Sequence, residues 1–393
     1  MSALKVICDR SALLDAINLA SGVVAARTPR PQLTCVKLVA HSGGDMTLAA
    51  TDGEVSLRLT LSRVDVQQPG ELLIPADKLR QIVSAEDAEP TLTLEADGDG
   101  CVIRGADARF TLHGYPAGDF PAIPAFQEMV AGAGGQPPAR DVFQHHAAAI
   151  DELITRTLFA TARENSRYAI NGVLLRRDGK KLEMVATDGR RLALCRSQIT
   201  ELEMDAEPAS AIIPSKALSL VQKLLGDDDE TVEVALTDAR AAFNIGVVDG
   251  GPARATLLTS LVEGAFPPFE DVIPKDQDIR VKFDRDVLAS AVRRAALLTN
   301  EESRGVRMAF HGGDKQVELS SRAPQMGEAE VKVDLAGYEG DDVEIGFNPA
   351  FITDALKVIN DPDVVLELKA GNKPGLLKSG GDFLYVVMPV NLQ

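Results

Sequence analysis

One phrase occurs twice in the chain, and it constrains the fold more than any other feature of the sequence. Thr-Asp-Gly lies between two apolar runs in residues 48–57 and again in residues 184–194, and Thr187 follows Thr51 by 136 residues. Asp-Gly between β-prone runs indicates a hairpin, because glycine adopts the positive φ that tight turns need. Two such hairpins, separated by roughly one third of the chain, favour a repeated domain.

A strand followed by a helix begins each third of the sequence. Residues 6–17 form the first copy, residues 281–292 repeat it 275 positions later, and residues 142–154 are a looser middle copy. Asp9 or Ser11 is expected to cap the first of these helices, because short polar side chains accept hydrogen bonds from the first-turn amides. These three strand-then-helix segments predict three units of similar structure.

A second helix recurs in each unit, and a strand follows it at nearly constant distance. The helices begin near Pro75, Pro214 and Asn348, and the strands are expected at 91–95, 232–236 and 364–368. Proline and asparagine suit a helix start, where an amide hydrogen has no partner within the helix. Each unit therefore reads as two helices packed on antiparallel strands, which is an α+β domain.

Boundaries are expected where the composition changes. Residues 120–124 and the Gly-, Ala- and Pro-rich stretch 131–138 separate the first unit from the second, and residues 266–274 separate the second from the third. Both segments carry apolar anchors, so they read as short crossings rather than disordered tethers. The expected domains are 1–128, 138–265 and 272–393.

Composition places the chain among ordinary globular proteins. It contains no run of eighteen apolar residues and its first residues lack a secretory pattern, so we expect a cytoplasmic protein with no membrane partner. The four cysteines, Cys8, Cys35, Cys101 and Cys195, are widely scattered. That spacing favours buried reduced thiols over a disulfide framework or a zinc site.

The distribution of charge points to a partner in spite of the net charge of −17. Cations concentrate on and beside the predicted helices, whereas acidic clusters at 95–99, 227–230 and 339–342 adjoin strands and read as solvated outer loops. The pattern favours a basic surface that meets phosphate backbone without reading sequence, although ordinary solvated helix faces are the alternative for each cation alone. Aromatic residues make up only 4%, which points to duplex rather than single-stranded nucleic acid.

A catalytic function finds little support in the sequence. The chain has five histidines, of which only His145 and His146 adjoin, and it has no P-loop, no Gly-x-Ser-x-Gly elbow and no paired-cysteine motif. We therefore expect no catalytic residues, no metal and no cofactor. The alternative is a metal-dependent hydrolase with repeated domains, in which Asp52 and Asp188 would be metal carboxylates.

Five segments together resemble the bacterial DNA polymerase III beta subunit family, the replicative sliding clamps. They are residues 171–175, 185–193, 300–307, 345–348 and 385–389. The resemblance spans the whole chain and implies a DNA-clamp fold of three similar α+β domains. It also implies a head-to-tail homodimer, closed into a ring around duplex DNA, that tethers DNA polymerase for processive synthesis as a non-enzymatic subunit of the holoenzyme. A clamp paralogue dedicated to repair or antibiotic tolerance is the narrower alternative.

The resemblance also implies partners and site residues. DNA polymerase III alpha subunit, the clamp loader, other polymerases and repair proteins would insert a Gln-Leu-x-Leu-Phe-like peptide into one apolar pocket. The pocket residues implied are Ile170, Thr187, Gly189, Arg190, Leu192, Pro267, Val272, Val386, Met388, Pro389, Val390 and Leu392. The residues implied to meet DNA are Arg27, Arg167, Tyr168 and Lys216. Those implied at the dimer interface are Lys78, Phe110, Leu112, Leu297 and Leu298; ordinary core contacts are the alternative for the four apolar ones.

The sequence departs from the family pattern in three places. Ala169 follows Tyr168 where a second aromatic residue is common. Glu270 and Asp271 stand where basic residues often follow the Phe-Pro crossing, and Asn391 replaces a common arginine, with an extra Gln393 behind it. We therefore expect a more acidic pocket rim and an altered partner preference.

Overall fold

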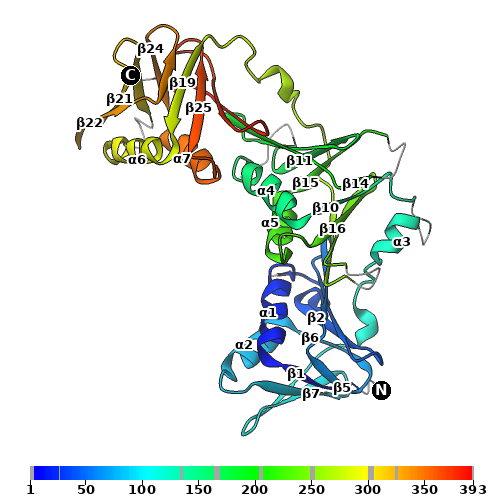
Figure 1. Cartoon of the computed structure of the whole chain (residues 1–393). Helices are drawn as coiled ribbons and strands as arrows, with labels where there is room; N and C mark the ends of the chain where they lie inside the picture. Colours follow the sequence, from blue (N-terminus) through cyan, green and yellow to red (C-terminus); the bar gives the residue numbers. More distant parts are fainter. Residues whose placement is uncertain are drawn as a thin grey trace. The chain divides into compact units, whose positions relative to one another are not determined.

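The computed structural model describes residues 4–25, 27–132, 135, 137–162, 169–202, 207–247, 253–299, 305–323 and 326–391 (Figure 1). The chain forms two compact units. The first contains Met1–Asp151 and Ile199–Leu261, and the second contains Glu152–Gln198 and Val262–Gln393. The middle third of the sequence is therefore divided, and each half of it shares a sheet with one of the outer thirds.

The first unit is built on two antiparallel sheets. The larger has the order β14-β10-β16-β17-β18-β4-β3-β2-β6 and the smaller β5-β1-β7-β8-β9. β18 of the middle third pairs with β4 of the first third, with Ala255 opposite Leu59, so one sheet crosses the expected domain boundary. The strands of these sheets are β1 (Lys5–Asp9), β2 (Cys35–Ala40), β3 (Met46–Thr51), β4 (Val55–Leu61), β5 (Val64–Gln68), β6 (Gly70–Pro75), β7 (Thr91–Asp97), β8 (Gly100–Arg104), β9 (Arg109–Leu112), β10 (Asp141–His146), β14 (Glu201–Leu202), β16 (Thr231–Leu236), β17 (Arg240–Ile245) and β18 (Ala255–Ser260). A further strand of this part of the chain, β15 (Ala209–Pro214), belongs to neither sheet.

Helices of the first unit bury one apolar face each, as the sequence spacing predicts. α1 (Arg10–Ser21) packs against α2 (Ala76–Ala85) and also contacts α5 (Ser215–Leu224). Asp9 is the cap of α1, because its carboxylate accepts from the amide of Ala12, and the Ser11 hydroxyl donates to the same carboxylate. Pro75 and Pro214 stand one residue before the first turn, as N-caps of α2 and α5.

One helix of the first unit was not expected. The sequence predicts a crossing at residues 120–124 and 131–138, and α3 (Phe126–Ala131) forms largely between these two stretches. Its Phe126 and Met129 pack on Ala235, Ala242 and Leu258 of the larger sheet. Apolar side chains between the two stretches therefore cover a face of the larger sheet.

The second unit also has two antiparallel sheets. Eight strands of its larger, nine-stranded sheet follow the order β11-β12-β13-β27-β26-β25-β19-β23, and the smaller sheet has the order β22-β21-β20-β24. β13 of the middle third pairs with β27, so Arg191 lies opposite Val387. The strands are β11 (Gly172–Asp178), β12 (Lys181–Thr187), β13 (Arg191–Gln198), β19 (Ile279–Asp284), β20 (Val306–His311), β21 (Gln316–Ala323), β22 (Gly327–Asp334), β23 (Gly337–Glu339), β24 (Val343–Phe347), β25 (Asp363–Leu368), β26 (Gly375–Ser379) and β27 (Phe383–Val387).

The two helices of the third repeat are capped as the sequence predicts. Asp284 accepts from the amides of Asp286 and Val287 at the start of α6 (Arg285–Ala295). Asn348 accepts from the amide of Ala350 at the start of α7 (Pro349–Lys357), with proline in the first turn. The strand-then-helix phrase at residues 281–292 thus repeats the geometry of residues 6–17, including the capping aspartate.

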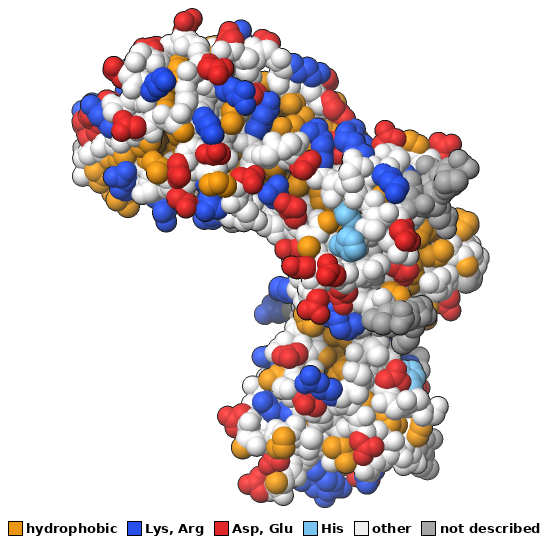
Figure 2. All heavy atoms as spheres, in the orientation of Figure 1, with side chains coloured by type: hydrophobic (Ala, Val, Ile, Leu, Met, Phe, Trp, Pro, Cys, Tyr) orange, Lys and Arg blue, Asp and Glu red, His pale blue; other side chains and the backbone are white. Residues whose placement is uncertain are grey.

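Burial modifies two expectations about charge. Arg156 on α4 (Ala147–Leu158) is only 7% exposed, pairs with Glu152 and lies 5.7 Å over the Phe383 ring, so it is not part of a solvated basic face. Glu230, expected in a solvated loop, binds Arg254 at 2.8 Å and caps the amide of Gly226. Lysine and arginine are interspersed with acidic side chains on the face shown in Figure 2.

The cysteines are buried free thiols, as expected. Burial raises the pKa of Cys8 and of Cys101 to about 12 and that of Cys195 to about 11. Among the described residues, no helix is both long and apolar enough to cross a membrane.

Candidate functional site

Both copies of the Thr-Asp-Gly phrase form the same hydrogen-bonded turn. Thr51 Oγ1 donates to the Val55 carbonyl at 3.0 Å and accepts from Gly53 N at 3.1 Å. Thr187 Oγ1 donates to the Arg191 carbonyl at 2.6 Å and accepts from Gly189 N at 3.1 Å. The glycine φ values are +98° and +86°, which confirms why each turn needs glycine.

The aspartates of the two turns are structural. Oδ1 of Asp52 accepts from the amides of Glu54 and Val55. Oδ1 of Asp188 accepts from the amides of Arg190 and Arg191. These carboxylates close their own turns, so the metal-ligand interpretation that supported a hydrolase loses its two residues.

A pocket with a cavity volume of about 180 Å³ opens beside the second turn, within the second unit. It lies where β12, β13 and the end of β27 meet the segment that follows Pro267. Its lining residues are Ile170, Thr187, Gly189, Arg190, Arg191, Leu192, Pro267, Phe269, Val272, Val386 and Met388.

Nine of the twelve residues expected at a peptide pocket lie together in this lining. Pro389 and Val390 adjoin Met388 in sequence but do not line it, and Leu392 lies outside the described residues. Arg191 and Phe269 line it and were not expected. Arg191 lies in the second Thr-Asp-Gly segment and Phe269 in the Phe-Pro crossing. Their position in these two segments is the sequence feature that could have identified them as pocket residues.

The pocket has a buried floor and an exposed rim. Leu192 and Val386 are 2% and 1% exposed, whereas Val272 and Met388 are 44% and 40% exposed. The amide of Met388 donates to the Arg190 carbonyl at 2.9 Å, which ties the end of β27 to the turn. Exposed apolar side chains over an apolar floor are what an apolar peptide anchor would cover, and methionine adapts its shape to such a ligand.

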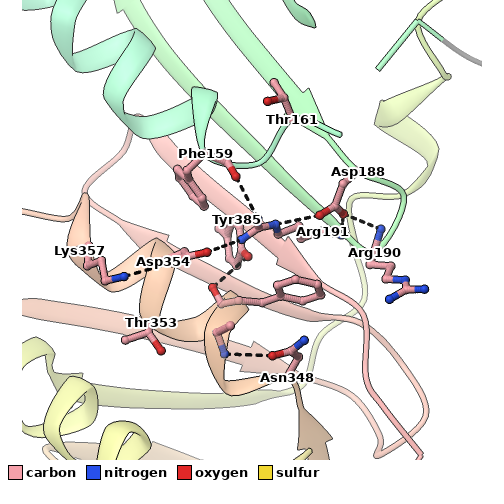
Figure 3. Close-up of polar contacts among 12 residues, drawn as sticks. Phe159, Thr161, Asp188, Arg190, Arg191, Asn348, Thr353, Asp354, Lys357 and Tyr385 are labelled. Atoms are coloured by element: carbon pink, nitrogen blue, oxygen red, sulfur yellow. Dashed lines mark hydrogen bonds and ion pairs between the residues drawn. The ribbon is translucent and has the colours of Figure 1, made fainter. Parts of the chain in front are cut away.

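Arg191 fixes the wall of the pocket through hydrogen bonds and aromatic contacts of its guanidinium (Figure 3). Its guanidinium donates to Asp188 at 3.0 Å, to Asp354 at 2.9 Å and to the Phe159 carbonyl at 2.9 Å, and it lies 4.6 Å over the Phe351 ring. Burial lowers the pKa of Arg191, but the bond to Asp354 and the other anionic contacts outweigh burial and raise it. The side chain is thus held as a cation in one position.

The adjoining rim carries less free negative charge than expected. Arg176 stacks at 5.1 Å over the ring of Phe269 and forms ion pairs with Glu270 and Glu183. Glu270 is therefore partly neutralised. Asp271 is exposed and forms no ion pair with the part of the chain that the structure describes, so the expected acidic rim depends on Asp271.

The residues expected to meet DNA are only partly described. Arg27 and Lys216 are in the first unit, and Arg27 is exposed. Lys216, on the first turn of α5, is half-exposed and forms an ion pair with Asp52 at 2.6 Å. Arg167 and Tyr168 lie outside the described residues, while Ala169 beside them is buried.

Four of the five residues expected at a dimer interface lie on or beside the outermost strand of a sheet. Phe110 and Leu112 are half-buried on β9, the outermost strand of the five-stranded sheet. Leu297 and Leu298 lie in the short helix η5 (Ala296–Leu298), which contacts β22, the outermost strand of the four-stranded sheet, and Leu297 is 72% exposed. Lys78 is exposed on α2 and donates to Gln81. An outermost strand leaves backbone groups open to pairing.

Three family descriptions match the chain in succession. The N-terminal domain of DNA polymerase III beta subunit matches residues 4–124, the central domain residues 145–268 and the C-terminal domain residues 270–391. The beta sliding clamp of Pseudomonas putida is 33% identical over 386 residues, covering 98% of this chain and 99% of that protein. The Escherichia coli beta sliding clamp is 28% identical and covers 99% of this chain and all of its own length.

A solved structure supports the same family assignment. A sliding clamp from Pseudomonas aeruginosa, solved bound to griselimycin, superposes with a TM-score of 0.87 at 31% identity, covering 99% of this chain and 100% of that one. Three clamp domains of helices and antiparallel sheets define a sliding clamp for a DNA polymerase. The chain belongs to the DNA polymerase III beta subunit family, and the expected fold class and function are confirmed.

Proposed function

We propose that this clamp acts in the cytoplasm as a head-to-tail homodimer that closes around duplex DNA and has no catalytic activity of its own. Its three domains would be 1–128, 138–265 and 272–393. The pocket beside Gly189 is the observation that carries the proposal. Nine of the twelve residues that the family resemblance implies at a partner-binding pocket line this one apolar cavity. A ring needs only weak DNA contacts, since topology retains it while the pocket holds its partners.

The pocket suits a peptide of the Gln-Leu-x-Leu-Phe type. Its lining is mainly apolar with a few polar groups, which is typical of sites that take apolar side chains. The buried floor at Leu192 and Val386 would take leucine and phenylalanine anchors, and the exposed rim would close over them. DNA polymerase III alpha subunit, the clamp loader, other polymerases and repair proteins would bind there in turn, because they would share one site.

Contacts with DNA would be made to phosphates without reading sequence. Arg27 and Lys216, together with Arg167 and Tyr168, are the proposed contact residues. A side chain that is half-exposed and pairs with a carboxylate, as Lys216 does, can exchange that partner for a phosphate. Such contacts weaken with salt and permit sliding.

Titration of a fluorescent Gln-Leu-Ala-Leu-Phe peptide against the full chain tests the pocket. Val272→Ala is expected to weaken binding about threefold to tenfold, because it removes an apolar rim contact. Val287→Ala is the matched control, since Val287 on α6 is similarly exposed, 48% against 44%, and does not line the pocket. Equal affinity for both variants and the unmodified chain would reject the assignment.

A further inference from the structure

The two repeated turns differ in what their aspartates bind with the second carboxylate oxygen. In the second copy, Oδ2 of Asp188 accepts from Nε of Arg191, three residues away on the adjoining strand. In the first copy the corresponding position is Val55, and Oδ2 of Asp52 instead accepts from Nζ of Lys216 at 2.6 Å. The first turn therefore reaches 164 residues along the sequence to a helix of the middle third.

The hydrogen bonds that close the first turn do not involve Lys216, because Thr51 Oγ1 and Oδ1 of Asp52 form them with groups of the turn itself. The second copy makes the same bonds, and there an arginine of its own strand binds the second carboxylate oxygen. In the first copy that second oxygen is the atom that restrains Lys216.

The pair joins an anchored anion to a more exposed cation. The side chain of Asp52 is 17% exposed and is anchored through Oδ1 to the amides of Glu54 and Val55, whereas that of Lys216 is 50% exposed. Burial raises the pKa of Asp52, but the bond from Lys216 and the two amide bonds outweigh burial and lower it, so the carboxylate stays ionised near neutral pH. A lysine on a four-carbon stem can leave such a partner, and the carboxylate then remains in place.

We propose that Asp52 competes with DNA phosphate for the ammonium group of Lys216 and thereby limits how tightly the clamp holds the duplex. This inference rests on the proposed role of Lys216 in meeting DNA. A phosphate can bind Lys216 only when the contact to Asp52 is broken or shared, so part of the interaction energy is lost. For a protein that must slide, an internal carboxylate at a contact lysine keeps the contact weak and quickly reversible.

Duplex binding by the full-length protein over a range of salt concentrations tests the proposal. Asp52→Ser removes the competing charge and keeps a side-chain oxygen for the turn amides, and equal melting temperatures would establish that the turn survives. Glu54→Ser is the matched control, because it removes one negative charge from the exposed side of the same turn, two residues away. Asp52→Ser is expected to tighten binding about twofold to fivefold, and Glu54→Ser clearly less.

The variant Lys216→Ala distinguishes a failure of the proposed competition from a failure of the proposed contact between Lys216 and DNA. If Lys216 meets DNA, Lys216→Ala weakens binding, and Asp52→Ser gains nothing when combined with it. A gain that persists in the double variant, or a gain no larger than that of Glu54→Ser, overturns the competition while leaving DNA contact intact. Unchanged binding by Lys216→Ala alone overturns the proposed DNA contact itself.

Discussion

Nη1 of Arg191 on β13 donates to Oδ2 of Asp354 on α7 at 2.9 Å. The two residues are 163 positions apart, and their side chains are 11% and 32% exposed. Arg191 also lines the pocket and holds the second repeated turn through Asp188. One side chain therefore links the pocket wall to a helix that contributes nothing to the pocket's lining.

Arg191→Ala is expected to weaken both folding and peptide binding. The change leaves Asp188 and Asp354 without their shared cation and costs about 1–3 kcal/mol, because hydrogen bonds to charged groups are lost from a mostly buried site. Arg80→Ala, which breaks an exposed ion pair on α2, is the control and should cost under about 0.5 kcal/mol. Equal melting temperatures for the two variants, with unchanged peptide affinity, would contradict this role.

Asp271→Arg is expected to change which peptides the pocket prefers. Asp271 is the exposed rim carboxylate left after Glu270 pairs with Arg176. Peptides flanked by acidic residues should bind about twofold to fivefold more tightly to the variant at low salt, and the difference should shrink at high salt. Glu263→Arg, at an exposed acidic position just before the crossing, is the control in an anisotropy titration. Identical titrations for both variants would remove Asp271 from the rim.

Glu183 is expected to make the stability of the fold depend on pH in the acidic range. It is 2% exposed, and although burial raises its pKa, bonds from Lys181, Arg196 and Arg176 outweigh burial and lower the pKa to about 2. A carboxyl whose folded pKa lies below its ordinary value of 4.5 stabilises the fold above that value, and this contribution is lost as pH falls toward 2.

Melting temperatures measured from pH 7 to pH 3 test the role of Glu183. Glu183→Gln should melt several degrees below the unmodified chain at pH 7, on the order of a few kcal/mol of lost stability, and the gap should narrow below about pH 4.5. Glu54→Gln, at an exposed site, should show neither effect. A gap for Glu183→Gln that stays constant down to pH 3 would mean that the charge of Glu183 does not stabilise the fold.

Leu297→Glu is expected to dissociate the proposed dimer. Leu297 is 72% exposed on the short helix beside the outermost strand β22, so a second chain is the expected cover. Sedimentation should give twice the chain mass for the unmodified protein and the single-chain mass for the variant. Val287→Glu, an exposed position on α6, should remain dimeric. Two variants that sediment alike would place the interface elsewhere.

Much of the fold follows from local chemistry that the repeats display. Gly53 and Gly189 need positive φ, and Asp9 and Asp284 cap their helices, so each feature is readable from a few neighbouring residues. The pocket residues came from the family resemblance, and nine of them meet in the structure. Their spacing alone could not have assembled them, because β13 and β27 pair across nearly two hundred residues.

What the sequence did not reveal depends on tertiary partners. Arg156 looks like any helix cation, yet it is buried over Phe383, more than two hundred residues away. Arg191 is held by an ion pair with Asp354. Arg176 is held by an ion pair with Glu183 and by stacking on the ring of Phe269. Such ion pairs are set by strand order, which no local pattern encodes.

Retention on closed circular DNA tests the central claim most directly. The protein would be loaded onto a nicked circular plasmid by its clamp loader, separated from free protein by gel filtration, and followed after a single restriction cut. A sliding ring predicts stable co-elution with the circle and rapid loss after the cut, because only topology retains it. Protein that stays bound to the linear DNA as firmly as to the circle would contradict the account.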